Sequence, residues 1–398
     1  MKSFSDLVIT ACSSLSPGFS LALGEDSYRT SFTECDLGAG ERLAVGRLCG
    51  EDESALVKWS QLERELERSD RSVQMSTFLC ERAFEQAGWR IDQESERTLV
   101  CVGSSRGASE LLEGSHSRFL LNQRTRIDTS PSTTLGQLSS FPLARLSFPS
   151  LGVGVAMTCS SSGLALMNAV SWITAGTADR ALVCGVEACL TPFTLHMLQL
   201  LGIYSGLSPV SEPIPCRPFE RDAPHGNTFV LGEGGACIAV ERKEDAQRRG
   251  ADILCSLEGI GVGFEKRRGK TAISEAGECL HCAMKQALNR TPPHMVDGVL
   301  LHGPGTVVGD RAERQALMDI FGCELPPCYS SKWLFGHTLG ASGLLSLAFA
   351  LWMFQKGKLL NFPYETELEE TVRPIHTVLI NSAGFGGGAS STLVRFEE

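Results

Sequence analysis

The sequence predicts an α/β protein made of two related halves, with one buried helix from each half in the middle of a layered sandwich. Two long stretches without Asp, Glu, Lys or Arg lead to this prediction, residues 146–178 and 333–355. Each contains a Gly/Ser-rich joint and an apolar helix-like pattern, and each leads on to an apolar strand, at 181–188 and 377–388. Helices that are apolar on every side are buried on every side, so both belong in the middle layer. The shared order of elements indicates a weak internal repeat.

The other elements follow from local patterns along the chain. Turn signals and periodicity predict strands at 7–12, 98–103 and 296–302, the first of which runs into a Ser-Pro-Gly turn. They also predict helical structure at 54–88 and 279–288, and a Pro-rich surface loop at 213–227. The charged segment 241–252 separates the halves, which we place at 1–245 and 246–398.

Composition narrows the class of protein. In 398 residues, 42% are hydrophobic and 21% charged, as in ordinary globular proteins. The net charge of −10 argues against nucleic-acid binding, which needs a basic face. Fifteen cysteines, an odd number, favour reduced, mostly buried thiols and a cytoplasmic location. We do not expect the first residues to form a signal peptide. Gly, Ser and His interrupt the uncharged run at 333–355, so we expect a buried helix and no membrane span.

The most informative stretch is VAMTCSSSGLAL, residues 155–166, which places Cys159 at the start of a predicted helix. A helix N-terminus favours the thiolate form of a cysteine. Small Ser and Gly neighbours also allow backbone N–H groups to face a reacting carbonyl, as an oxyanion hole requires. The joint therefore suits a nucleophile, although a buried structural cysteine is the ordinary alternative for any one of fifteen thiols.

Three further motifs accompany this cysteine. LHGPGTVVGDRAE places His302 at a strand end before a Gly-Pro-Gly turn, and SSKWLFGHTLGASG places Lys332 and His337 five residues apart before a helix. NSAGFGGGAS is a glycine-rich loop after a strand and contains Phe385. Each motif alone is common, but together and in this order they form a specific set.

With these motifs the chain resembles the condensing enzymes of the thiolase fold, specifically the elongating β-ketoacyl-acyl carrier protein synthases. The resemblance covers nearly the whole chain and includes the segment RPFERDAPHGNTFVLGEGGA (residues 217–236). It implies a thiolase-like fold, in which two pseudo-repeated halves form a layered αβαβα sandwich. It also implies a dimer, either with a second copy or with a related subunit. The partner in catalysis would be an acyl carrier protein with phosphopantetheine-bound acyl and malonyl groups.

The same resemblance assigns roles to individual residues. Cys159 would accept the acyl chain, and His302 and His337 would bind the malonyl thioester oxygen as decarboxylation turns it into an enolate. Neutral imidazoles that donate N–H bonds suit that task. Lys332 would add positive potential, and the N–H groups of Cys159 and Phe385 would form the oxyanion hole.

Other assignments concern the gate and the substrate. The resemblance implies that Phe229 acts with Phe385 as a gate between the acyl and malonyl sides, and that Thr306 contacts substrate. Arg106 would stand where related enzymes have an apolar residue in the acyl channel. An unpaired guanidinium is unfavourable in a dry channel, so Arg106 pairs with a carboxylate such as Glu110, turns outward, or meets a polar substrate. We predict that Arg106 limits or polarises the channel.

One further assignment concerns docking. Arg124 and Arg126 lie in the region where related enzymes dock their carrier protein, and a basic patch there would suit an acidic carrier. A solvated loop is the alternative interpretation. The resemblance implies no cofactor and no metal.

The chain departs from the family pattern at several positions. Pro304 replaces a usual threonine, Ser346 replaces a glutamate of many fatty-acid enzymes, and Ala383 replaces a common phenylalanine, while Glu313 matches the family's acidic residue. These changes point toward a specialised polyketide or polyene pathway more than toward housekeeping fatty-acid synthesis.

Four alternative functions remain to be weighed. A degradative thiolase needs a second cysteine in the C-terminal glycine loop, but the last cysteine is Cys328. Both histidines disfavour a starter-type synthase of the Cys-His-Asn kind. A chain-length-factor-like subunit, the non-enzyme alternative, usually lacks the nucleophile, so Cys159 argues against it. A membrane protein is the least favoured alternative.

Overall fold

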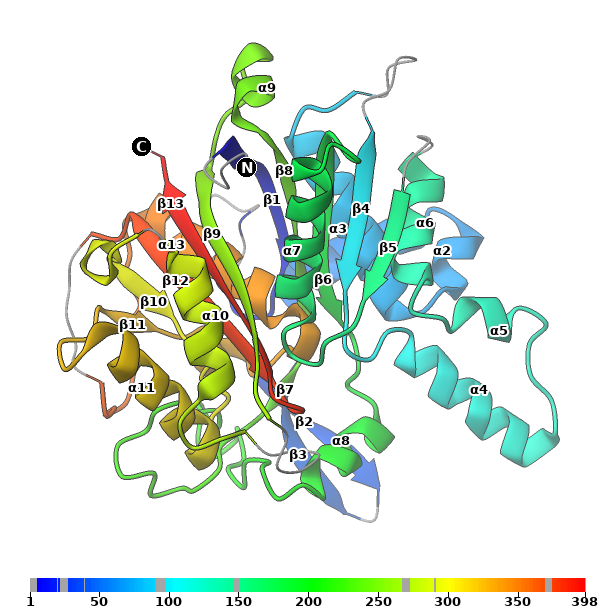
Figure 1. Ribbon diagram of the computed structural model, residues 1–398. Coiled ribbons are helices and arrows are strands. Elements are labelled where there is room, and N and C mark those ends of the chain that lie inside the picture. The colour runs from blue at the N-terminus through cyan, green and yellow to red at the C-terminus, as the bar shows by residue number, and fades with distance from the viewer. Residues whose placement is uncertain are drawn as a thin grey trace.

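The computed structural model describes residues 6–19, 21, 28–38, 40–90, 97–146, 151–266, 273–289, 291–368 and 374–397. Its centre is a ten-stranded sheet in the order β11-β10-β12-β13-β9-β1-β8-β6-β4-β5 (Figure 1). The first half contributes β1 (Leu7–Leu15), β4 (Thr98–Gly103), β5 (Leu151–Val155), β6 (Arg180–Glu187) and β8 (Gly234–Arg242). The second half contributes β9 (Cys255–Phe264), β10 (Gly298–Leu300), β11 (Cys328–Tyr329), β12 (Thr377–Gly384) and β13 (Gly388–Phe396).

The two halves of this sheet have the same topology. Numbered along the chain within each half, the strands lie in the order first, fifth, fourth, second, third. The first two pairings in that order are antiparallel and the last two are parallel, in both halves. Within the described part of the sheet, β1 pairs with β9 to join the two halves, with Val8 opposite Ser256 and Ile9 opposite Cys255. The predicted internal repeat is therefore confirmed as a repeat of topology.

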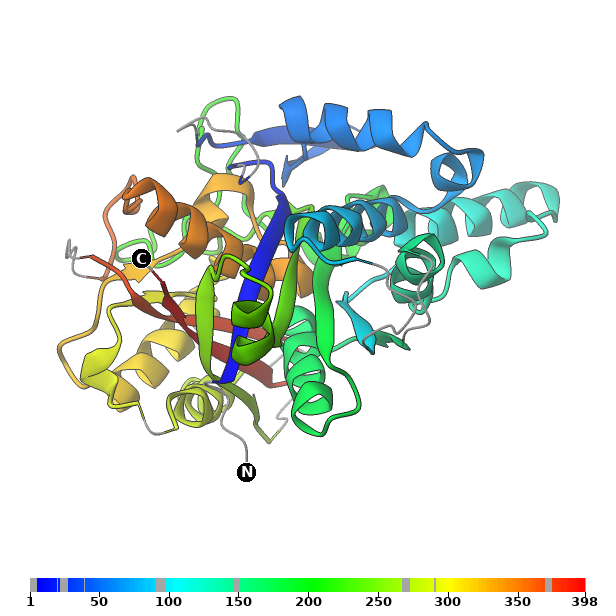
Figure 2. The same cartoon turned by 90° about the horizontal axis from the view of Figure 1, so that it is seen from above.

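Helices complete the layers. α7 (Ser161–Thr174) and α13 (Ser342–Lys356) each contact strands of both halves and form the central layer. α3 (Arg71–Gln86) covers the outer face of the first half, and α10 (Glu278–Leu288) covers that of the second. In Figure 2, α3 and α7 lie on opposite sides of the first half, and α13 and α10 on opposite sides of the second. This is the layered αβαβα arrangement that the resemblance implied.

The remaining elements surround this core. A small sheet of order β2-β3-β7 consists of β2 (Phe32–Gly38), β3 (Glu41–Gly46) and β7 (Leu231–Gly232). The other helices are α1 (Gly50–Ser60), α2 (Arg64–Arg68), α4 (Ser109–Asn122), α5 (Thr129–Ser132), α6 (Gln137–Leu146), α8 (Pro192–Gln199), α9 (Lys243–Arg248), α11 (Val307–Phe321) and α12 (Lys332–Phe335), with short 3₁₀ turns η2 (Pro293–Met295) and η3 (Leu339–Ala341). Figure 1 shows α4 and α5 extending away from the main body.

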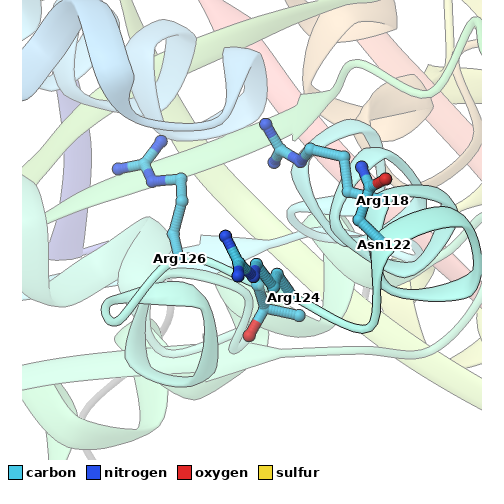
Figure 3. A pocket seen from close by; sticks show the side chains of 5 residues that line it. Arg118, Asn122, Arg124 and Arg126 are labelled. Atoms are coloured by element: carbon cyan, nitrogen blue, oxygen red, sulfur yellow. The ribbon is translucent and has the colours of Figure 1, made fainter.

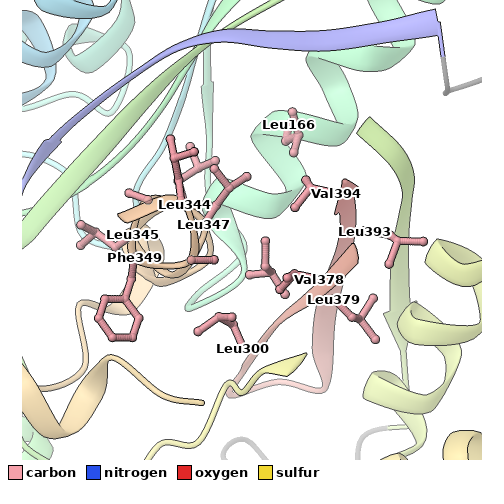
Figure 4. Close-up of a cluster of buried hydrophobic side chains, with 14 of the residues drawn as sticks. Leu166, Leu300, Leu344, Leu345, Leu347, Phe349, Val378, Leu379, Leu393 and Val394 are labelled. Carbon is pink, nitrogen blue, oxygen red and sulfur yellow. The ribbon is translucent and has the colours of Figure 1, made fainter. Parts of the chain in front are cut away.

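The central helices explain both uncharged stretches. α13 is buried along almost its whole length, and Figure 4 shows its Leu344, Leu347 and Phe349 among side chains of β10, β12 and β13. α7 differs from the prediction, because Ser171 and Thr174 of its last turns are exposed. Within the described residues, no helix combines the length and the apolar character that crossing a bilayer requires.

Other sequence predictions need adjustment. The helical stretch predicted at 54–88 is three helices, α1, α2 and α3, and the strand predicted at 296–302 is limited to β10. The loop at 213–227 lacks helix and strand as predicted, but it is not simply a surface loop, because Cys216 and Phe219 within it are buried. The boundary proposed at 245/246 falls within α9 and remains a prediction.

The cysteines behave as predicted in one respect. All fifteen are free thiols, and most of them are buried. The interpretation that the sequence has no Cys-x-x-Cys pair is wrong: Cys279 and Cys282 on α10 have this spacing, with the first thiol buried and the second exposed.

Candidate active site

Cys159 lies on the tight connection between β5 and α7, where a sheet strand delivers it to the start of a central helix. The preceding residue, Thr158, has a φ of 45°, a left-handed conformation that is rare for a β-branched side chain. Such strain is typical of functional joints that are held by their surroundings. The Cys159 side chain is buried, with 7% of its surface exposed.

The glycine-rich loop between β12 and β13 packs directly against this joint. A Cβ atom on Gly384 would come within 2.0 Å of Thr158 Oγ1 and 2.8 Å of the Cys159 backbone nitrogen, so only glycine fits. Ser382 Oγ donates a hydrogen bond to the Cys159 carbonyl at 2.6 Å, and Thr158 Oγ1 donates to the Phe385 carbonyl at 3.2 Å. The loop that carries Phe385 is therefore fixed beside the candidate nucleophile.

Two buried histidines face each other beside this joint. His302 follows β10 and His337 follows α12, and their ring centroids are 5.1 Å apart at an angle of 77°. The Leu339 backbone N–H donates to His337 Nδ1 at 3.0 Å. In the neutral ring this assigns the proton of His337 to Nε2, which makes Nε2 the donor.

Burial decides the charge of both rings. It lowers the pKa of His302 and His337 well below the usual histidine value, and the nearby Lys332 lowers both further. Both imidazoles are therefore neutral at physiological pH, which is the form that the role implied by the resemblance requires. Lys332 is buried as well, and burial lowers its pKa while the carboxylate of Glu313 raises it.

Glu313 holds the segment that carries His302 in place through hydrogen bonds. Its carboxylate accepts the backbone N–H of His302 at 2.8 Å and that of Gly303 at 2.7 Å. Asn381 Nδ2 donates to the same group at 3.1 Å, which ties the segment to β12. Burial raises the pKa of Glu313, and these hydrogen bonds oppose the shift.

Phe229 connects the thiol with the histidines. It belongs to the same apolar cluster as Cys159 and Leu339, and its ring lies 5.3 Å from that of His337 and 5.7 Å from that of Tyr204. The structure thus brings Cys159, Phe229, His337 and His302 into one continuous buried site.

The ionisation of Cys159 differs from the sequence prediction. α7 begins two residues later, so the helix dipole is present, but burial raises the pKa of the Cys159 thiol and the charge of Glu187 raises it further. Lys332 and Arg106 act in the opposite direction. The resting group is a thiol rather than the thiolate that a helix start alone predicts.

Glu187 is the residue that sequence reasoning missed. It is fully buried at the end of β6, and its carboxylate accepts five hydrogen bonds. The donors, at 2.6–3.0 Å, are Ser104 Oγ, Ser105 N, Ser105 Oγ, Arg106 N and Gly340 N. It therefore joins the loop after β4 to the turn that follows His337. Its position at the end of a buried strand, before Ala188 and Cys189, was the available signal.

Thr306 and Arg106, both predicted to contact substrate, have surroundings that differ from those expected. Thr306 is the N-cap of α11, where its Oγ1 accepts the Gly309 N–H at 3.2 Å. Arg106 is exposed, and the described residues contain no ion pair between it and Glu110. An exposed guanidinium favours the alternative in which Arg106 turns outward, and the prediction that Arg106 limits or polarises the acyl channel remains a prediction.

The two arginines predicted for carrier docking differ from one another. They line an open hollow of about 470 Å³ together with Arg118, Asn122 and Thr125 (Figure 3). Arg126 is paired with Asp128, at 2.5 Å between Nη2 and Oδ2 and 2.9 Å between Nε and Oδ1. Its charge is largely compensated, whereas Arg124 and Arg118 are exposed.

The repeated topology, with a cysteine at the start of one central helix, defines a thiolase-like condensing enzyme. Comparisons with known proteins agree. The N-terminal domain of the β-ketoacyl synthase family matches residues 58–246, and the C-terminal domain matches residues 254–363. The chain therefore belongs to the β-ketoacyl synthase family and is a condensing enzyme of the acyltransferase class.

Individual relatives support this assignment. The 3-oxoacyl-[acyl-carrier-protein] synthase 2 of Mycobacterium tuberculosis (strain ATCC 25618 / H37Rv) is 30% identical over 346 residues, which cover 82% of this chain and 81% of that protein. Two solved structures share the fold at 20% identity: the ishigamide ketosynthase/chain length factor, with a TM-score of 0.84, and a type II PKS ketosynthase in complex with its acyl-carrier protein, with a TM-score of 0.81. Each alignment covers 98% of this chain and 99% of the other.

Proposed function

We propose that the protein elongates an acyl chain by decarboxylative condensation of an acyl group on Cys159 with a malonyl group on acyl carrier protein. One observation carries the proposal: a buried thiol, two neutral histidines and a buried lysine lie in one site, and a glycine-rich loop packs against the thiol. The relatives named as acyl-carrier-protein synthases support carrier-bound substrates.

The first step transfers the acyl group. The sulfur of Cys159 attacks the carrier thioester, a C–S bond forms to Cys159, and the C–S bond to the carrier breaks. The proton of the Cys159 thiol leaves with the carrier thiol. The backbone N–H groups of Cys159 and Phe385 stabilise the tetrahedral oxyanion, and the close approach of Gly384 holds the two segments together.

The second step uses the histidines. The malonyl thioester loses CO₂, and the electron pair of the broken C–C bond forms an enolate on the thioester oxygen. His337 Nε2–H and a ring N–H of His302 donate to that oxygen, and Lys332 adds positive potential. The enolate carbon attacks the acyl carbonyl on Cys159, a C–C bond forms, and the C–S bond to Cys159 breaks. The β-ketoacyl carrier is released, and the Cys159 thiolate takes up a proton from solvent.

Loading of the thiol tests the proposal directly. Offered a panel of acyl-carrier proteins, the wild-type chain should gain the mass of an acyl group, and peptide mapping should place it on Cys159. Cys159→Ala should abolish loading, while Cys189→Ala, which removes a buried thiol of the same apolar cluster, should retain it. Acylation of another cysteine would overturn the assignment.

The exposed surfaces of the first half indicate where a partner subunit would bind. β5 is the edge strand of the large sheet, and the protruding α4 region exposes Leu121 and Ile127. A second copy or a related subunit would cover these surfaces, and the fold is shared with the ishigamide ketosynthase/chain length factor structure. Because Cys159 and both histidines are in place, we assign this chain the active role and not that of a chain-length-factor-like partner.

The pathway and location complete the proposal. Ser346 on α13 is buried and uncharged, whereas many fatty-acid enzymes of the family have a glutamate at this position. This departure from the family pattern is the one that most favours a specialised polyketide or polyene pathway over housekeeping fatty-acid synthesis. The free thiols are consistent with work in the cytoplasm. Metabolite analysis of a strain lacking the gene, compared with one producing Cys159→Ala, would test both the pathway and the catalytic role.

A further inference from the structure

Three cysteines converge in the core of the first half, in a cluster separate from the one that contains Cys159. Cys80 comes from α3, Cys184 from β6 and Cys237 from β8. Their Sγ atoms all lie within 4.8 Å of one another, and the Sγ atoms of Cys80 and Cys237 are 3.9 Å apart. All three side chains are fully buried.

The fold explains why the sulfurs meet. Cys184 and Cys237 are direct cross-strand partners, so their side chains leave the sheet on the same face. α3 packs on this face and presents Cys80 to them. Leu79, Val102 and Val186 belong to the same apolar cluster. Three soft donors therefore meet in surroundings that offer hydrocarbon rather than water.

The spacing fits one ion held by three sulfurs. Thiolate ligands bind metal ions at about 2.3 Å, and three donors at that distance in one plane lie about 4 Å apart. We propose that Cys80, Cys184 and Cys237 form a binding site for a soft monovalent cation, with Cu(I) as the representative ion. Zinc fits less well because structural zinc takes four ligands, and in the described part of the chain no further His, Asp or Glu side chain joins the three thiols.

Charge also favours a monovalent ion. Soft sulfur ligands select Cu(I). One cation bound by one thiolate, with the two neutral thiol sulfurs as weaker donors, releases a single proton and leaves a neutral complex. Deprotonation of all three thiols around the same ion would bury a net charge of −2 with no cation to balance it, which is strongly unfavourable in an apolar core.

The test uses the full chain under anaerobic, reducing conditions. Accessible thiols, including Cys282 and Cys323, are first blocked by alkylation, and peptide mapping checks that the three cluster thiols remain free. Cu(I) is then added in the presence of a competing chelator, once to the native chain and once during refolding. The refolding sample allows the ion to bind even if it cannot reach the core of the folded protein. Retained copper is counted, and X-ray absorption gives the number of sulfur neighbours.

We expect one Cu(I) per chain, bound by three sulfurs, and a higher midpoint of thermal unfolding because the ion binds only the folded state. Cys80→Ala, Cys184→Ala and Cys237→Ala should each weaken binding at least tenfold. Cys101→Ala, which removes a buried thiol of the neighbouring strand β4, should not. No retained copper, two sulfur neighbours, or equal retention by all four variants would each overturn the proposal.

Discussion

Replacing Glu187 by glutamine tests how the site is held together. One carboxylate oxygen accepts Ser104 Oγ and the Arg106 N–H, and the other accepts Ser105 Oγ and the N–H groups of Ser105 and Gly340. Whichever oxygen becomes an NH₂ group, at least one of the backbone N–H groups of Ser105, Arg106 and Gly340 then faces a donor. One such orphaned group costs about 1–3 kcal/mol, and the remaining bonds lose their charge assistance.

We therefore expect Glu187→Gln to lower the free energy of unfolding by at least about 1 kcal/mol, and by up to about 3 kcal/mol for each N–H group left without an acceptor. It should also change the thiol, because the charge of Glu187 raises the pKa of Cys159. Without that charge the pKa falls, so the pH at which Cys159 reacts with iodoacetamide should move downward. Denaturant unfolding gives the first quantity, and mass spectrometry of Cys159 alkylation against pH gives the second.

Glu241→Gln is the matched control. Glu241 is also a buried carboxylate, bonded to Thr10, Trp89 and Arg249, but it lies at the opposite end of the β6–β8 pair. It should destabilise the fold without moving the Cys159 alkylation profile. The reasoning fails if Glu187→Gln costs less than about 1 kcal/mol or if the two variants show the same alkylation profile.

Three other predictions concern the reaction and its substrates. His302→Ala and His337→Ala should each leave loading of the nucleophile measurable while condensation falls by about 10²-fold or more, and near wild-type condensation in both would refute their roles. Arg124→Glu should raise the KM for carrier-bound substrate and weaken its salt dependence, whereas Arg126→Glu should change KM less because its guanidinium is already paired; an unchanged KM for Arg124→Glu at low salt would reject the docking surface. Arg106→Ile should change loading of a long saturated acyl chain by no more than about twofold, as expected for an exposed side chain, and a large gain would restore its role in the channel.

The sequence was most informative where chemistry is local. Cys159, His302 and His337 each stand in a short motif at the end of a strand or the start of a helix, and the structure brings them together. The repeat could be predicted only as an order of elements, because the two central helices share apolar character and not residue identity. Their different exposure, with Ser171 of α7 reaching the surface, depends on packing that the pattern does not contain.

Long-range contacts were beyond local reasoning. Glu187 receives its hydrogen bonds from loops about 80 and 150 residues away in sequence, so no motif contains both donor and acceptor. The three clustered thiols come from α3, β6 and β8 in the same way. In contrast, Arg126 pairs with Asp128, which stands only two residues later in the chain. A carboxylate at that spacing is a local signal, and it could have indicated that the two docking arginines differ in free charge.

The charges of the site explain why a resting thiol is compatible with catalysis. Burial raises the pKa of Cys159 and lowers that of both histidines, so the empty site holds a neutral thiol and neutral rings around one buried lysine. In the proposed reaction, negative charge then develops on the reacting oxygens, first at the oxyanion hole and later on the enolate. Donors that are fixed before reaction stabilise such charge most when it is absent from the ground state. A permanent thiolate would attract these donors already in the free enzyme and reduce that difference. In the proposed reaction, the raised pKa of Cys159 therefore serves the transfer step, and the neutral histidines serve the decarboxylation step.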